Sequence, residues 1–352
     1  MATRIKSNFW VIQIGRYLIP LICLVLAYHM LIPQIAAPEK SYKLFQQMTL
    51  WVVMLAVIAQ VISILGSGYL LQAIVHTSGG KLGLFLGTSI VLAAASLGMV
   101  LGGLIGTATA TYRWIQKQGI KSEIAGLAGT IPGFFNISVL AIVSVAGIAH
   151  LLLVHELSNI QAVSFALILL MLISLVSLSI WGYHNQHKLI HLAHYLGMRW
   201  ARIRRKIYNP DRMEEKLGEL FQSWDLLVAG GWHGPALGAT INLVFDMLTL
   251  YLLFIAAGNP VSPAILLTGY GLPLILGKMA FIIPGGVGII EGSMIALYSG
   301  LGVPGSIALV VVLTYRMLSF WLPLLLGFPI IWILQSRVQG GIIKPAENNI
   351  PR

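Results

Sequence analysis

The residues of this sequence that could do chemistry gather in its last third, where four ionisable side chains interrupt long apolar runs. They are Asp246, Lys278, Glu291 and Arg316. An ionisable side chain at membrane depth costs about 3 kcal/mol or more, so each is a candidate for a functional site. Their formal charges sum to zero, as a buried network of charges requires.

A glycine-rich segment lies between two of these charges. Pro284, Gly285, Gly286 and Gly288 stand within an apolar stretch and are expected to interrupt a helix. Unwound backbone inside a membrane is tolerated only where protein buries it or where it lines a cavity. A broken helix beside a charge, here Glu291, is how many transporters build a substrate site.

The sequence leaves two interpretations of the charges open. In the structural one, Arg316 pairs with Glu291 and Lys278 pairs with Asp246, which fastens the broken helix to its neighbours. In the functional one, Lys278 and Arg316 meet an anionic headgroup in a polar cavity, because the planar fork of Arg bonds two phosphate oxygens. The helix that opens near Gly286 would add amide donors, and Glu291 would balance the cations or carry a proton.

Other polar residues carry weaker signals. Asn242 lies four residues before Asp246 and shares its helix face, so we expect it to contact a neighbouring helix rather than a ligand. Segment 184–225 is basic. Four histidines at helical spacing begin it, and we expect an interfacial helix there and no metal site: His184, His187, His191 and His194. Five cations follow, and we expect them to contact anionic lipid heads: Arg199, Arg202, Arg204, Arg205 and Lys206.

The composition is typical of a polytopic membrane protein. The 352 residues are 57% hydrophobic and 9% charged, whereas soluble domains carry about 25% charged residues. The single cysteine, Cys23, excludes an intramolecular disulfide and a thiolate metal cluster. The net charge of +11 comes without a nucleic-acid-binding motif, and its Lys and Arg residues flank apolar runs. We therefore expect no nucleic acid partner.

Apolar runs that can cross about 30 Å of hydrocarbon predict an all-α membrane domain over residues 1–352 with six full spans. The runs are 10–32, 46–76, 122–153, 161–183, 226–257 and 304–334. Two further stretches, 82–118 and 262–300, are interrupted by glycines and are predicted to form re-entrant or broken-helix hairpins. The distribution of Lys and Arg places both termini in the cytoplasm, and we expect the protein in the inner membrane.

The two interrupted hairpins resemble one another. Their glycines recur at an interval of 183 residues: Gly102, Gly103 and Gly119 match Gly285, Gly286 and Gly302. Because the order span, hairpin, span recurs, residues 46–153 and 226–334 are predicted to form two repeat units. Three full spans separate the starts of the units, and this odd number predicts an inverted repeat. Such repeats place a site near the membrane midplane.

The glycine-rich segments of the chain resemble those of a known family. Pro284-Gly285-Gly286-Val287-Gly288 with Glu291, then Gly302, Thr314-Tyr315-Arg316 and Pro323, resembles the transmembrane region of lysylphosphatidylglycerol synthases. Gly102-Gly103 with Arg113 and Gly119 resembles that family's first glycine-rich segment. The resemblance covers residues 45–335 approximately and implies lipid translocation. The synthases transfer an amino acid with a separate soluble domain, which is not found here, so we do not expect this chain to aminoacylate lipid.

We therefore expect a protein that moves a lipid, or a lipid-linked headgroup, between leaflets, and that is not an enzyme. The sequence shows no P-loop and no cofactor motif, so transport is expected to be facilitated or coupled to an ion gradient. The expected partners are lipids with anionic headgroups, and an oligomer is possible. The expected site consists of Lys278, Glu291, Arg316, Asp246, Asn242, Pro284, Gly285, Gly286 and Gly288.

Two other classes remain open. The first is a membrane-embedded enzyme acting on lipid phosphate, in which Glu291 and His233 would form an acid–base pair. The second is a scaffold that transports nothing and gathers lipid-synthesis enzymes. An enzyme would turn over lipid in detergent without a sealed bilayer, and in a scaffold the charged residues would affect stability alone.

Overall fold

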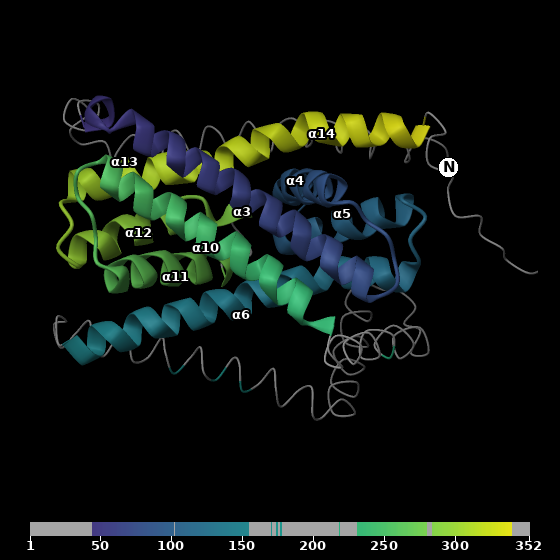
Figure 1. Ribbon diagram of the computed structural model, residues 1–352, viewed down its shortest axis with the longest axis horizontal. Coiled ribbons are helices and arrows are strands. Elements are labelled where there is room, and N and C mark those ends of the chain that lie inside the picture. Colours follow the sequence, from purple (N-terminus) through teal and green to yellow (C-terminus); the bar gives the residue numbers. More distant parts are fainter. Residues whose placement is uncertain are drawn as a thin grey trace, which may run out of the picture.

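The computed structural model describes residues 44–154 except 102, residues 231–339 except 280–283, and four isolated positions between these ranges. The described residues form helices joined by short connections, with no strand among them (Figure 1). The predicted spans 10–32 and 161–183 fall outside the described residues, apart from isolated positions. So do the histidines and cations of segment 184–225.

The helices fall into two series along the chain. The first is α3 (Leu50–Thr77), α4 (Leu84–Leu101), α5 (Gly103–Lys117) and α6 (Ser122–Val154). The second is α10 (His233–Ala256), α11 (Pro263–Met279), the 3₁₀ turn η2 (Pro284–Gly286), α12 (Ile289–Gly300), α13 (Gly305–Arg316), the π-helical turn η3 (Met317–Trp321) and α14 (Leu322–Gln339).

Four of the described helical segments are long and apolar enough to cross a bilayer. They are Leu50–Thr77, Ser122–His150, His233–Ala256 and Gly305–Ser336. Each coincides with a predicted span. Large apolar side chains such as Trp51 and Trp332 are exposed on these helices, as expected where lipid replaces water. Pro132 and Pro329 lie inside α6 and α14, which membrane helices tolerate because neighbouring groups bond the freed carbonyls.

The interrupted stretches form two pairs of shorter helices. α4 packs against α5, and α11 packs against α12. The connections that join α4 and α5 to their neighbours lie toward one end of the long helices, and those that join α11 and α12 lie at the other end (Figure 1). The long helices therefore enclose two hairpins that are attached at opposite ends of the molecule.

Each hairpin also packs against a long helix from the other series. α4 crosses α14 closely, because Gly327 has no side chain to meet the Ser96 hydroxyl, which donates to the Leu324 carbonyl at 2.9 Å. α11 crosses α6 in the same manner, where Gly271 faces the side chain of Ser144. Small residues at such crossings let two helix backbones approach within a membrane.

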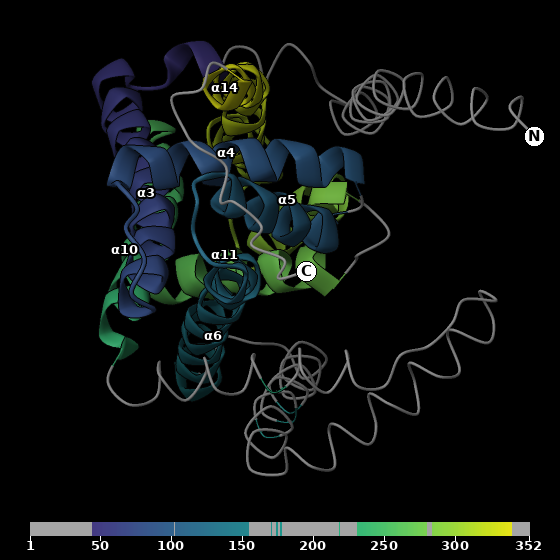
Figure 2. The same cartoon turned by 90° about the vertical axis from the view of Figure 1, so that its right-hand side faces the viewer.

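The two series meet along α3 and α10, which lie side by side on one flank of the molecule (Figure 2). Gly66 and Gly238 permit this contact. A Cβ at Gly66 would lie 2.7 Å from the Asn242 nitrogen, and one at Gly238 would lie 2.6 Å from the Leu70 nitrogen. Neither glycine could carry a side chain without separating the two helices.

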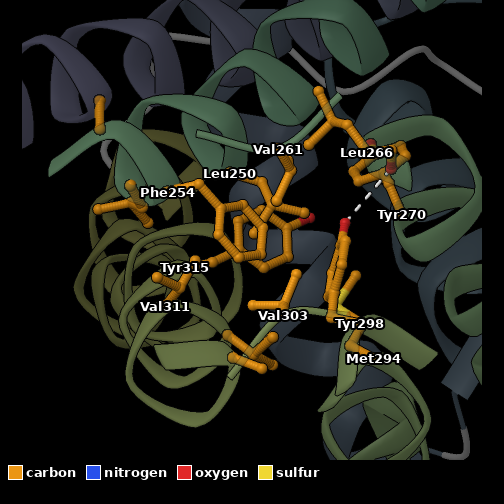
Figure 3. Close-up of a cluster of buried hydrophobic side chains, with 14 of the residues drawn as sticks. Leu250, Phe254, Val261, Leu266, Tyr270, Met294, Tyr298, Val303, Val311 and Tyr315 are labelled. Carbon is orange, nitrogen blue, oxygen red and sulfur yellow. Dashed lines mark hydrogen bonds between the residues drawn. The ribbon is translucent and has the colours of Figure 1, made fainter. Parts of the chain in front are cut away.

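The largest apolar core cluster lies between α10, α11, α12 and α13 (Figure 3). Its largest members include Phe254, Tyr270, Tyr298 and Tyr315, which are all fully buried. The Tyr298 hydroxyl donates to the Leu266 carbonyl at 3.3 Å. The hydroxyls of Tyr270 and Tyr315 lie at the edge of this core and bond the carboxylate of Asp246.

Candidate functional site

The predicted helix interruption is present between α11 and α12. Gly285, Gly286 and Gly288 have φ values of 66°, 61° and 85°, a left-handed conformation that glycine adopts without steric cost. The surroundings also exclude side chains. A Cβ at Gly285 would lie 2.4 Å from the Phe320 ring and 3.0 Å from the Met99 sulfur, and one at Gly286 would lie 2.9 Å from the Gly277 Cα.

The interruption is held by a buried ion pair. The Arg316 Nε donates to Glu291 Oε1 at 2.6 Å, and the Gly288 amide donates to Glu291 Oε2 at 2.6 Å. Arg316 Nη2 donates to the Gly285 carbonyl at 3.1 Å, and its guanidinium lies 4.2 Å from the centre of the Phe320 ring. Both charged residues are about 95% buried, with 4% and 5% exposed.

Both members of this pair lie at helix ends. Glu291 lies in the first turn of α12, where a carboxylate is stabilised by the free amides and the helix dipole. Arg316 is the last residue of α13, immediately before the π-helical turn, and such turns occur often at functional sites. The pair is the structural contact that one interpretation of the sequence expected.

Asp246 occupies a separate polar cluster. Its Oδ2 accepts hydrogen bonds from the hydroxyls of Tyr270 at 2.8 Å and Tyr315 at 2.5 Å, and its Oδ1 accepts one from Gln60 Nε2 at 3.1 Å. These donors come from α11, α13 and α3. The ion pair expected between Lys278 and Asp246 is not formed: both residues are described, and Lys278 is not within ion-pair distance of the carboxylate. Three neutral donors bond the carboxylate instead.

Asn242 contacts α3 one turn before Asp246. Its Nδ2 donates to the Ser63 hydroxyl and to the Ser63 carbonyl, both at 3.0 Å, and the Ser63 hydroxyl donates to the Asn242 carbonyl at 2.9 Å. These bonds join the closely approaching backbones of α3 and α10. Asn242 therefore has the helix-contact role expected of it, and its bonds go to protein.

Lys278 differs from the other three charges. It lies one residue before the end of α11, its side chain is exposed, and no ion pair to a described residue is formed. Gly277, the preceding residue, allows the unwound segment to approach α11. The side chain therefore projects from the helix next to the interruption and makes no ion-pair contact with a described residue, while Asp246 acts on its charge from a distance.

Asp246 and Arg316 lie near the middle of long helical spans. Asp246 is ten residues before the end of α10, and Arg316 is eleven residues after the start of α13. At a rise of 1.5 Å per residue these positions are about 15 Å and about 17 Å from the shared end, which is close to half of a hydrocarbon core of about 30 Å. Both helix ends lie on the same side of the molecule (Figure 1).

The described contacts of Glu291 do not include His233, its candidate acid–base partner. His233 is the first residue of α10, where its ring lies 4.0 Å from that of Trp232. It precedes Asp246 by thirteen residues, so it is about 20 Å away along the helix axis. The described residues also contain no group of three or more His, Cys, Asp or Glu side chains that could hold a metal ion.

Three residues of the polar cluster were not predicted from the sequence. Gln60, Tyr270 and Tyr315 donate the hydrogen bonds that Asp246 accepts from the described side chains. Gln60 had a weak signal, because an amide side chain is uncommon in a membrane-spanning helix, but α3 also contains Gln72. The tyrosines had none, since tyrosine is common in membrane helices and its partner depends on tertiary packing.

The fold and the buried charges define an integral membrane protein of the polytopic, all-helical class. Residues 17–327 match the family described as the lysylphosphatidylglycerol synthase TM region, and the chain belongs to this family. This confirms the resemblance inferred from the glycine-rich motif. The match includes all of the described helices except the last part of α14.

Two archaeal proteins are similar over part of the chain. A UPF0104 membrane protein of Pyrococcus horikoshii is 32% identical over 139 residues, which cover 36% of this chain and 41% of that protein. A UPF0104 membrane protein of Methanocaldococcus jannaschii is 26% identical over 140 residues, which cover 37% of this chain and 40% of that protein. The chain thus spans about two-fifths of the length of each relative.

Proposed function

We propose that this protein moves a lipid, or a lipid-linked headgroup, between the leaflets of the cytoplasmic membrane. The observation that carries the proposal is Lys278, an exposed cation next to the helix interruption, inside the membrane-spanning part of the chain. A charge at this depth is costly unless it has a partner. An anionic headgroup passing the hairpin would provide that partner while the lipid tails remain in the bilayer.

The headgroup would bind beside the ion pair rather than replace it. Glu291 and Arg316 bond each other and the unwound backbone, so they hold the interruption open. Lys278, which lacks a described ionic partner, is the side chain that would meet the phosphate. Amides of the unwound segment would add donors, as they do where helix ends bind anions.

Features that an inverted repeat would explain support the proposal. Glycines at corresponding positions have left-handed conformations in both series: Gly103 and Gly286 have φ values of 66° and 61°, and Gly119 and Gly302 have 77° and 91°. The packing is also reciprocal, since α4 contacts α14 and α11 contacts α6. The repeat units would be residues 46–153 and 226–334, related by an axis in the membrane plane.

The two hairpins would be re-entrant. α4, α5, α11 and α12 contain 18, 15, 17 and 12 residues, so their lengths are about 18 to 27 Å, short of a full crossing of about 30 Å. The four described spans, with 10–32 and 161–183, would make six. Both termini would then be cytoplasmic, which agrees with the basic connections around Lys81 and Lys121.

A lipid-flipping measurement tests the function. Purified protein would be reconstituted into vesicles of phosphatidylethanolamine and phosphatidylglycerol with a trace of fluorescent phosphatidylglycerol, and the outer fluorescence would be quenched chemically. Wild-type protein should expose the inner pool, whereas protein-free vesicles should not. Lys278→Gln should slow the exchange about tenfold or more, because a charge-assisted hydrogen bond contributes about 1.5–3 kcal/mol.

The matched control is Lys81→Gln. Lys81 is also exposed, but it lies in the connection between α3 and α4, away from the interruption. This variant should exchange lipid at the wild-type rate. Equal rates for wild type and Lys278→Gln, with both proteins folded by their elution from a sizing column, would contradict the headgroup role of Lys278. No exchange by wild type with a series of anionic lipids would contradict lipid movement itself.

A further inference from the structure

We propose that Asp246 is a proton-binding site, and that its protonation couples the movement of the hairpin to the proton gradient. The proposal rests on the proposed function for its transport role, but the binding of the proton can be tested separately. Asp246 lies near mid-membrane and bonds donors from three other helices. It is one of two carboxylates at this depth in the described segments.

The two carboxylates have different surroundings. Glu291 bonds the Arg316 guanidinium directly, so its negative charge is neutralised in place. No described cation lies within ion-pair distance of Asp246, whose three bonds come from neutral groups. A carboxylate in an apolar bundle without a cation in contact gains most from binding a proton. Asp246 is therefore the carboxylate suited to exchange one.

Gln60 provides the second observation. Its side chain is 95% buried, with 5% exposed, and its Oε1 has no hydrogen-bond partner among the described residues, whereas its Nε2 donates to Asp246 Oδ1. A buried acceptor without a donor is uncommon and needs an explanation. The geometry suggests a second state of Gln60 and Asp246, in which Gln60 Oε1 accepts a hydrogen bond.

That donor would be the protonated carboxyl group. When Asp246 is ionised, Gln60 Nε2 donates to Oδ1. When a proton binds to Oδ1, the new O–H becomes a donor, and a half-turn of the Gln60 amide presents Oε1 to accept from it. The step is a simple gain of one proton by one carboxylate, and the reverse step releases it. The amide thus bonds Oδ1 in both states.

A change at Asp246 would reach the proposed headgroup site. Tyr315, which donates to Asp246 Oδ2, directly precedes Arg316 in α13, and Tyr270, the other donor to Oδ2, lies two turns before Lys278 in α11. Protonation weakens the carboxylate as an acceptor for both hydroxyls. The position of α11 and α13 around the interruption would then depend on whether the proton is bound.

The groups that face Asp246 come from each helix packed around it. α3 provides Gln60, α11 provides Tyr270 and the positive charge of Lys278, and α13 provides Tyr315 and the positive charge of Arg316. The two cations act across a distance rather than by contact. The Asp246 side chain itself is partly exposed, so a proton can reach it.

Infrared difference spectroscopy tests the binding of the proton in detergent. Wild-type protein titrated from mildly acidic to mildly alkaline pH should lose the carbonyl band of a protonated carboxyl group, and Asp246→Asn should lack this change. Tyr315→Phe should shift the midpoint of the titration, whereas Tyr298→Phe, the matched control, should not. Tyr298 is equally buried, but its hydroxyl bonds the Leu266 carbonyl. A band change that persists in Asp246→Asn, or no band change in wild type, would overturn the proposal.

The coupling is tested in the same fluorescent phosphatidylglycerol vesicles with an imposed pH gradient. For wild type, the distribution of lipid between leaflets should shift relative to protein-free vesicles, reverse with the gradient and disappear with a protonophore. For Asp246→Asn this shift should be lost. An even distribution in wild type despite active exchange would overturn the coupling. If no lipid moves in any sample, the proposed function fails, and the infrared titration alone decides whether Asp246 binds a proton.

Discussion

The four charges of the second series have three different environments. Glu291 and Arg316 neutralise each other and bond the unwound backbone, Asp246 is held by tyrosine and glutamine donors, and Lys278 is exposed. A set of residues that sums to zero charge is thus not one network. The pair bonds the unwound backbone of the interruption, while Asp246 and Lys278 lie outside this ion pair.

The ion pair can be measured by a double-mutant cycle. Glu291→Gln alone and Arg316→Gln alone should each destabilise the protein by about 3–5 kcal/mol, because each leaves a buried charge without its partner. The double variant should be less destabilised than the sum of the two, since it contains no unpaired charge. The measurement is the free energy of unfolding in mixed micelles with increasing denaturing detergent. Additive losses would show that the pair contributes nothing through its contact.

At this scale the sequence predicted the charged residues but not their partners. Charges inside apolar runs are rare enough to be conspicuous, and Glu291 and Arg316 do pair. The partners of Asp246 come from α3, α11 and α13, so they depend on how three helices cross α10. No local pattern encodes such a crossing, so the expected partner of Asp246 was wrong.

The helix interruption is the element that the sequence predicted best. Three of its glycines have left-handed backbones, which explains why the motif contains glycine at these positions. The reciprocal packing of α4 on α14 and of α11 on α6 was not predicted, because it brings together residues such as Ser96 and Gly327 that are far apart in the chain. The π-helical turn after Arg316 also lacked a local signal.

Two glycine substitutions separate backbone conformation from helix propensity. Gly286→Ala should destabilise the protein by more than about 1–2 kcal/mol, because a left-handed residue with a Cβ costs this much and the new atom would lie 2.9 Å from the Gly277 Cα. Gly292→Ala is the control, since Gly292 lies within α12 with open space around it.

The control should be neutral or stabilising by up to about 1 kcal/mol, because alanine favours a helix more than glycine does. The shift in melting temperature of each variant in detergent provides the comparison. Equal shifts for the two variants would mean that the interruption does not require its left-handed backbone.

For the whole molecule, the four described spans and the family were predictable, because membrane helices are recognised by length and apolarity. The relation between the two series of helices is seen in how they are arranged in space. Opposite attachment of the hairpins, matched left-handed glycines and reciprocal packing all agree with an inverted repeat. An inverted repeat matters for function, since it allows one hairpin to open toward each face of the membrane in turn.

The inversion can be tested by labelling single cysteines in cells with a maleimide that does not cross membranes. Cys23→Ser would remove the one native thiol, and one of four exposed positions would then be changed to cysteine. Lys81 and Lys121 flank the first hairpin, and Ser262 and Ser299 flank the second. If the repeat is inverted, Ser262→Cys and Ser299→Cys should react in intact cells, whereas Lys81→Cys and Lys121→Cys should react only after permeabilisation. Reaction of all four from the same side would require the two hairpins to enter from one face, and alternating exposure of a single site would then lose its structural basis.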